Sequence, residues 1–301
     1  MNSALHKTVL FDNFSVEDST WSGACGTDFM MYENPSFLAE SRHPYKMDHT
    51  LVILCTAGES SGKVNLKDYH IVKDGLLVVL PHHIMEMGAV SEDFRASYVI
   101  TSEAFQSSLD IAGAFQLHQE MEDRPWRNFS GRELESIEAY FSMCKNTLQA
   151  EDNPNRLEII RLLTKAFFLG LGYYLHQETP EETLSREDRI AKQFITLVEA
   201  NYTRVREVEE YAGRMAISPK YLSMSVKAST GKTPGAWIGS YVTLDARAQL
   251  ASTRKTILQI SDALGFSTQS EFGRYFKRIV GMSPKAYKDT VFQDGFESSV
   301  E

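Results

Sequence analysis

Two segments in the last third of the chain share one pattern of apolar, turn and helix-ending residues. Four pairs of matched positions are 49 residues apart: Val208 and Ile257, Tyr211 and Ile260, Met215 and Leu264, Ile217 and Phe266. Four further pairs are 50 apart: Leu222 and Phe272, Val226 and Phe276, Gly231 and Gly281, Pro234 and Pro284. The one-residue difference falls in a turn, where insertions are tolerated. The repeat therefore indicates one small helical unit used twice.

The second copy predicts two short helices around a tight turn. Its first helix places an apolar stripe at helical spacing, formed by Ile257, Ile260, Ala263 and Leu264. Gly265 can then adopt the left-handed conformation that ends a helix, and Ser267 or Thr268 can cap the next one. Phe272 and Phe276, four residues apart, face the core. A glycine-containing turn between two such helices is the helix-turn-helix pattern.

The repeat also resembles a known family. Residues 186–290, and above all the stretch ALGFSTQSEFGRYFKRIVGMSPKAY, resemble the DNA-binding domain of AraC/XylS-type transcriptional regulators. The resemblance implies an all-α DNA-binding domain over 189–290, with helix-turn-helix units at 205–228 and 256–279. The first unit departs from the family pattern, because Met224 replaces the usual arginine of the recognition helix and Val226 the usual phenylalanine. Residues 235–252 are expected to form the helix that joins the units.

Charge is distributed unevenly along the chain. The 301 residues suit about two domains and carry a net charge of −9, yet residues 186–290 hold 17 Lys and Arg against 10 Asp and Glu. A basic module on an acidic body suits phosphate binding. The chain has no apolar run of about 20 residues and no secretory signal, and its three cysteines are widely spaced. We therefore expect a cytoplasmic protein with no membrane partner.

The first part of the chain reads as short strands. They are expected at 28–32, 51–55, 64–66, 76–80 and 96–100, with turns at Gly58–Gly62, 73–75 and Pro81. Such spacing favours a sandwich or barrel, and DGLLVVLPHHI after a Gly-Ser loop is similar to the cupin-like sensor domain of many AraC-type regulators. The predicted fold class is α+β: a cupin-like domain over 1–129, a helical segment over 130–177, and then the DNA-binding domain.

A cupin can be a metalloenzyme, so the histidines need weighing. Metal-binding cupins carry an HxH pair, whereas His82 and His83 are adjacent and His49 and His70 lie elsewhere. In a strand, adjacent side chains point to opposite faces. Surface or loop histidines are favoured over small-ligand contacts and over a metal site. We expect no metal, no cofactor and no catalytic residues. An oxygenase or isomerase with an accessory helical domain is the enzymatic alternative.

Residues 130–177 change to a helical period. A first seam contains Leu134, Ile137, Phe141, Cys144 and Leu148, and after a break at 152–154 a second contains Ile160, Leu163, Phe167, Leu171 and Tyr174. The second helix has surplus apolar residues: Ile159, Leu162, Phe168 and Leu169. They pack either within the chain or, as the dimer helices of similar regulators imply, in a homodimer. We expect a linker at 178–188 and a disordered tail at 291–301.

The resemblance assigns DNA-contacting residues to both units. They are Lys220, Ser223, Met224 and Lys227 in the first, and Thr268, Gln269, Ser270, Gly273, Arg274 and Lys277 in the second. An ordinary solvated helix face is the alternative. We expect a sequence-specific, double-stranded-DNA-binding transcription regulator, an activator responding to a small-molecule effector, with RNA polymerase a further candidate partner. A ligand-independent DNA-binding protein is the other alternative, and a fully packed barrel would favour it.

Overall fold

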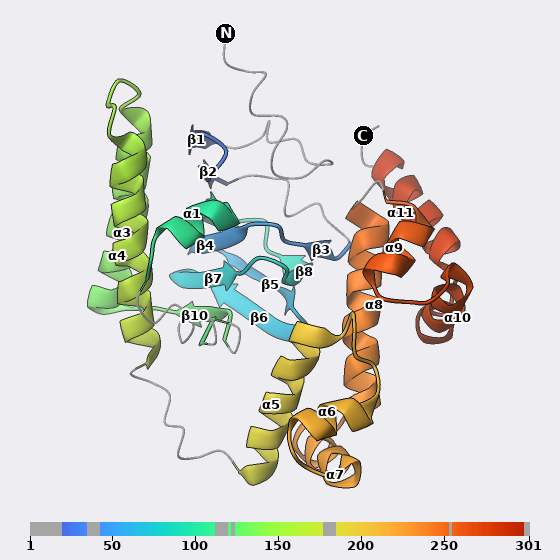
Figure 1. Cartoon of the computed structure of the whole chain (residues 1–301). Coiled ribbons are helices and arrows are strands. Elements are labelled where there is room, and N and C mark those ends of the chain that lie inside the picture. Colours follow the sequence, from blue (N-terminus) through green and yellow to red (C-terminus); the bar gives the residue numbers. More distant parts are fainter. Residues whose placement is uncertain are drawn as a thin grey trace. The chain divides into compact units, whose positions relative to one another are not determined.

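The chain folds into two compact units. The computed structural model describes residues 20–34, 43–111, 120–121, 124–176, 185–252 and 255–297. One unit contains residues 1–42 and 46–179, and the other contains 43–45 and 180–301. Strands dominate the first unit and helices dominate the second (Figure 1). This is the α+β arrangement that the sequence predicts.

The strands form two sheets. In chain order they are β1 Trp21–Cys25, β2 Phe29–Glu33, β3 Tyr45–Lys46, β4 Thr50–Ala57, β5 Glu59–Val64, β6 Lys67–Val72, β7 Gly75–Val79, β8 Ile84–Val90, β9 Arg95–Thr101 and β10 Trp126–Asn128. One sheet has the order β1-β2-β9-β4-β7-β10 and the other β3-β8-β5-β6. The β2–β9, β9–β4, β4–β7 and β5–β8 pairs are antiparallel.

The larger sheet is buried on both faces. Successive strand residues point to opposite sides, so Val52 and Leu54 join the cluster beneath the helices while Leu51 and Ile53 join the cluster between the sheets. The helices on this face are α1 Glu103–Ser108, α3 Gly131–Gln149 and α4 Arg156–His176 (Figure 1). Two buried faces explain the continuous apolar runs of β4 and β7.

One strand expectation and one turn expectation were largely wrong at the β5 hairpin. Of residues 64–66, expected as a strand, Val64 ends β5, whereas Asn65 and Leu66 form the β5–β6 turn with positive φ angles of 47° and 69°. Most of the expected turn Gly58–Gly62 is instead strand β5. Its small residues suit a crowded position, because a Cβ on Gly62 would lie 2.2 Å from the Glu86 carbonyl oxygen. Composition alone made this segment look like a loop.

The two long helices pack their predicted seams within the chain. Phe167 is 8% exposed, and its ring stacks on Tyr140 with a centroid distance of 4.3 Å. Of the surplus apolar residues, Phe168 is buried, whereas Leu162 and Leu169 are 56% and 45% exposed. The intrachain interpretation therefore holds for the seam, and part of the surplus remains on the surface.

The helices of the second unit reproduce the sequence repeat. They are α5 Arg186–Asn201, α6 Val208–Arg214, α7 Pro219–Thr230, α8 Pro234–Ser252, α9 Ile257–Ala263, α10 Gln269–Val280 and α11 Pro284–Glu297. Helices α6 and α9 both have 7 residues, and α7 and α10 both have 12. The turns match as well, since Ala216 (φ 53°) occupies the place of Gly265 (φ 72°). Helix α8 contacts α7, α9 and α10 and so joins the units as predicted.

Three local expectations need correction in the second unit. Ala263 is exposed, and Ser261 is buried in its place. Helix α5 begins at Arg186, so 186–188 belongs to its first turn rather than to a linker; Ser185 and Asp188 form a capping box there. Helix α11 continues to Glu297 with Val291 buried, so 291–297 is no disordered tail. Residues 177–184 and 298–301 lie outside the described residues. None of the described helices could span a membrane.

Candidate nucleic-acid interface

Helices α7 and α10 have well-defined ends. The side chains of Ser218 and Thr268 each accept a hydrogen bond from the backbone N–H three residues on, at 3.2 and 3.1 Å. Such N-caps contribute about 1 kcal/mol each. Each helix ends at a glycine in the left-handed conformation, with φ of 74° at Gly231 and 89° at Gly281. Capped ends hold the first turn, the part that a recognition helix presents to bases.

An aromatic chain fixes the orientation of α10. Ring centroids are 5.3 Å apart for Phe266 and Phe272, 5.8 Å for Phe272 and Phe276, and 5.7 Å for Phe276 and Tyr287. All four side chains are buried. In α7, Leu222 and Val226 take the places of the two helix phenylalanines. Because the apolar faces are anchored, the opposite faces point to solvent.

The residues expected to contact DNA in α10 lie on its exposed side. Gln269, Ser270, Arg274 and Lys277 are exposed, and their side chains have no hydrogen-bond or ion-pair partner among the described residues. Thr268 is exposed too and serves as the N-cap. Gly273 is partly exposed, and no atom lies within 4 Å of where its Cβ would be. This face is open to a ligand, although DNA contact by these residues remains a prediction.

The matching face of α7 is less polar. Lys220 and Lys227 are exposed, Ser223 is half-buried, and Met224 is 61% exposed. These residues occupy positions i, i+3, i+4 and i+7, so they share one helix face. The set Ser270, Gly273, Arg274 and Lys277 has the same spacing 50 residues later. Both helices thus present one cation-bearing stripe, but only α10 places an arginine in it.

Arg206 is an important residue that the sequence analysis missed. It lies in the loop between α5 and α6, yet its guanidinium contacts the turn between α9 and α10. In the repeat it matches Lys255, an unremarkable cation 49 residues later. No spacing or motif could have marked it, because the contact joins two segments about 60 residues apart.

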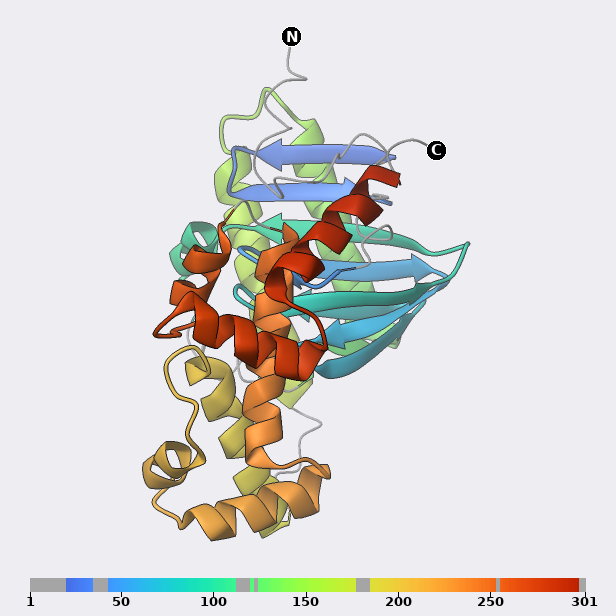
Figure 2. The same ribbon diagram turned by 90° about the vertical axis from the view of Figure 1, so that its right-hand side faces the viewer.

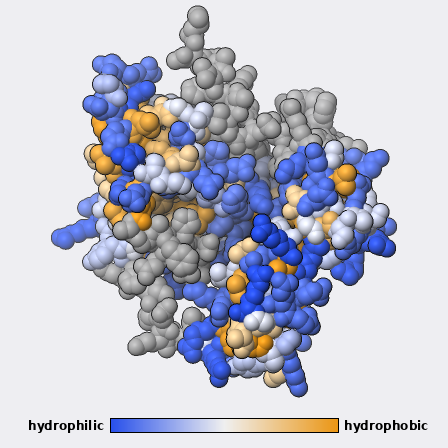
Figure 3. All heavy atoms as spheres, viewed as in Figure 1, coloured by the Kyte–Doolittle hydropathy of each residue, from blue (hydrophilic) through white to orange (hydrophobic). Residues whose placement is uncertain are grey.

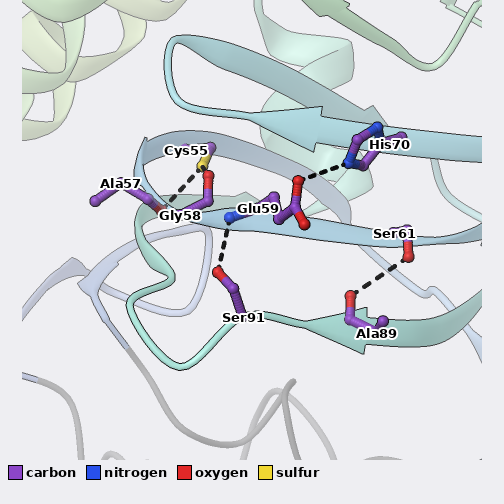
Figure 4. A network of polar contacts seen from close by, with 8 residues as sticks. All are labelled: Cys55, Ala57, Gly58, Glu59, Ser61, His70, Ala89 and Ser91. Atoms are coloured by element: carbon purple, nitrogen blue, oxygen red, sulfur yellow. Dashed lines mark hydrogen bonds and ion pairs between the residues drawn. The ribbon is translucent and has the colours of Figure 1, made fainter.

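The histidines that the structure describes in the first unit do not converge. His70 on β6 contacts Glu59 on β5, with 3.1 Å between Nε2 and Oε2 (Figure 4). His82 is exposed at a positive φ of 67° in the turn after β7, and His83 is buried beside it. Across the parts of the chain that the structure describes, no group of three or more His, Cys, Asp or Glu could hold a metal ion.

Cys55 is a buried thiol at the same corner of the sheets. Its Sγ lies 3.3 Å from the carbonyl oxygen of Ala57 and 3.5 Å from that of Gly58 (Figure 4). Burial raises the pKa of Cys55 to about 11. The group is therefore protonated at neutral pH, and a protonated thiol is a poor nucleophile.

Comparison with known proteins agrees with this geometry. A family model described as a helix-turn-helix domain matches residues 211–290. Residues 211–290 form an AraC-type helix-turn-helix domain. The match includes most of α6 and all of α7, α8, α9 and α10.

Several known proteins are similar to part of this chain. An uncharacterised HTH-type transcriptional regulator of Bacillus subtilis, YobQ, is 33% identical over 30% of this chain and 35% of its own length. The HTH-type transcriptional activator RhaS of Yersinia pseudotuberculosis is 26% identical over 53% of this chain and 56% of its own. The C-terminal domain of AraT from Geobacillus stearothermophilus is 27% identical, covering 35% of this chain and 88% of that one, with a TM-score of 0.33. The chain thus spans about a third to just over half of these curated relatives.

Proposed function

We propose that the protein is a sequence-specific transcription regulator that binds double-stranded DNA through its AraC-type domain. The observation that carries the proposal is the repeated stripe on α7 and α10. Buried side chains anchor it from behind, and its own side chains have no polar partner among the residues that the structure describes. Such a stripe can enter a major groove while nearby cations contact phosphates. The similarity to HTH-type transcriptional regulators supports the same conclusion.

The two recognition helices would read DNA differently. Arg274 can donate two hydrogen bonds to a guanine and Gln269 can pair with an adenine, each discriminating by ~1–3 kcal/mol. Met224 offers only apolar contact, for instance with a thymine methyl group. Lys227 and Lys277 lie one turn further along and would meet phosphates. Base recognition by hydrogen bonds is therefore concentrated in the half-site that the second helix-turn-helix unit contacts.

Selection from random DNA followed by a base-substitution series tests this proposal. Arg274→Ala should weaken binding to the selected sequence by ~1–3 kcal/mol and relax base preference at one position. Lys277→Ala, the matched cation one turn away, should weaken all sequences alike and reduce the salt dependence. Enrichment of no sequence would refute the proposed function. Loss of base preference with Lys277→Ala but not with Arg274→Ala would refute the assigned roles.

The first compact unit, in which strands dominate, is proposed to be a cupin-like sensor of a small molecule. Two facing sheets and the family resemblance support this assignment. The space between the sheets is occupied by a cluster rich in tyrosine and methionine, including Tyr32, Tyr69, Tyr98 and Met85. That filling favours the second candidate, ligand-independent DNA binding. Titration of operator binding with and without metabolite extract separates the two, since only the sensor predicts a shift.

Helix α4 is proposed to form part of a homodimer interface. Leu162, Leu169 and Tyr173 are 56%, 45% and 63% exposed and follow i, i+7, i+11 spacing along one face. Figure 3 shows apolar surface over α3 and α4. Exposed stripes of this kind commonly mark protein contacts.

As an activator the dimer would act in the cytoplasm, with RNA polymerase as a further partner. No catalytic activity is part of the proposal.

A further inference from the structure

The two helix-turn-helix units touch at a second place besides α8. The loop between α5 and α6 leads into the first helix-turn-helix unit, and the turn between α9 and α10 lies within the second (Figure 2). A Cβ added to Gly265 in that turn would lie 2.0 Å from the carbonyl oxygen of Thr203 in the loop. Backbone therefore meets backbone at this point, and only glycine allows the approach.

Arg206 stabilises the same contact between the α5–α6 loop and the α9–α10 turn. Its Nη2 donates a hydrogen bond to the carbonyl oxygen of Leu264. Its guanidinium carbon lies 3.5 Å from the ring centroid of Phe266 and 5.9 Å from that of Tyr275. Phe266 and Tyr275 contact each other at 5.2 Å, and Tyr275 is a residue of recognition helix α10. Cation–π contacts and a donated hydrogen bond thus link the loop of the first unit to α10.

Comparison of the two repeats indicates that the Arg206 contact serves the junction between the helix-turn-helix units rather than the internal structure of either unit. Lys255, just before the second helix-turn-helix unit, is the residue that matches Arg206. Its Nζ donates a hydrogen bond to the side-chain oxygen of Gln249 on α8, 3.3 Å away. Arg206 instead reaches out of its own unit. Helix α8 and this loop connect the two helix-turn-helix units at two points. Together they restrain a rotation of one unit relative to the other that α8 alone would allow.

We propose that Arg206 is a positioning residue that fixes the separation of α7 and α10 and so sets the half-site spacing that the domain accepts. The inference rests on the proposed function. One inserted base pair moves a half-site by ~3.4 Å along DNA and rotates it by roughly 35°, since a turn contains 10–10.5 base pairs. Two rigidly held helices cannot follow such a shift, whereas two loosely joined helices can.

A DNA-free measurement tests the rigidity. Spin labels on Lys227→Cys and Lys277→Cys, both exposed positions, report the distance between α7 and α10 in the full chain. The native cysteines are buried, which limits background labelling. Arg206→Ala should broaden the distance distribution at least twofold. Arg204→Ala, which removes the same charge from an exposed position in the same loop, should leave it narrow. An unchanged width in Arg206→Ala overturns the proposal.

Binding to spaced operators provides the functional readout. Starting from the selected operator, one or two base pairs are inserted or removed between the half-sites. Wild type and Arg204→Ala should lose at least tenfold in affinity per step. Arg206→Ala should lose less than threefold per step while binding the original spacing about five- to tenfold more weakly. A profile as steep as wild type in Arg206→Ala overturns the proposal.

One further variant and the DNA-free readout keep the outcomes separate. Arg206→Met retains an apolar side chain over Phe266 without the donor, so it replaces Arg206→Ala if thermal melting shows that the alanine variant does not fold. Failure of wild type to select any DNA sequence would refute the proposed function, and the spin-label widths would still decide the role of Arg206.

Discussion

Replacing Gly265 by alanine should destabilise the second helix-turn-helix unit far more than the same change at other glycines. Gly265 has a φ of +72°, and an added Cβ would lie 2.0 Å from the Thr203 carbonyl oxygen. Left-handed alanine costs ~1–2 kcal/mol, and forcing the backbone apart costs a further ~1–3 kcal/mol. Reduced freedom of the unfolded chain returns ~0.4–1 kcal/mol. We expect a net loss of about 1–4.5 kcal/mol.

Two other glycines separate these contributions. Gly281 has a φ of +89° with no atom within 4 Å of an added Cβ, so Gly281→Ala carries the backbone penalty without the clash. It should destabilise the unit by about 1 kcal/mol. Gly213 lies in helix α6 with open space around it. Gly213→Ala should therefore stabilise the protein by ~0.5–1 kcal/mol.

Hydrogen exchange during urea unfolding is the suitable assay, because the chain has two units that can unfold separately. Peptides from α9 and α10 report the second helix-turn-helix unit alone. The reasoning predicts that Gly265→Ala lowers the urea midpoint of these peptides most and Gly281→Ala lowers it less. If the Gly265 and Gly281 variants differed by less than about 0.5 kcal/mol, the approach of the Thr203 carbonyl would be refuted.

Three further outcomes are expected. Gly273→Leu should leave the free energy of unfolding within ~0.5 kcal/mol of wild type, because its Cβ position is open, while operator affinity falls at least tenfold; unchanged affinity would remove Gly273 from the interface. Leu169→Asp should dissociate the dimer in light scattering without unfolding it, whereas Phe167→Asp, in the intrachain core, should unfold the first unit; a monomeric wild type would count against the interface. Elemental analysis of purified protein should find no stoichiometric Fe, Mn or Zn, and one metal ion per chain lost with His82→Ala would reopen the enzymatic interpretation.

The sequence alone determined the local structure of the second unit. Apolar spacing and helix-ending residues act over one or two turns, so the repeat placed the helices α6, α7, α9 and α10 and the chain reversal at Gly265. Both G-x-x-P endings behave as expected, with Gly231 and Gly281 left-handed and the prolines starting α8 and α11. The exposed stripe on α10 also follows from sequence, because the buried phenylalanines define its opposite face.

The first unit was less predictable because its contacts are long-range. The β4 and β7 strands were recognisable as apolar runs, but their pairing depends on residues more than 20 positions apart. The polar segment β5 looked like a turn because of its glycine and serine content, and its pairing with β8 joins residues more than 20 positions apart. Likewise, the seam on α4 was readable, whereas which surplus side chains stay exposed depended on how the helix packs on the sheet.

Only the tertiary structure decided how the two helix-turn-helix units are held together. Sequence periodicity describes one helix at a time, and it predicted the joining helix α8. The Arg206 contact with Phe266 and the close approach of Thr203 to Gly265 bring together residues about 60 positions apart. Nothing local requires an arginine at 206, because its hydrogen bond and its ring contact exist only after both units have folded and docked.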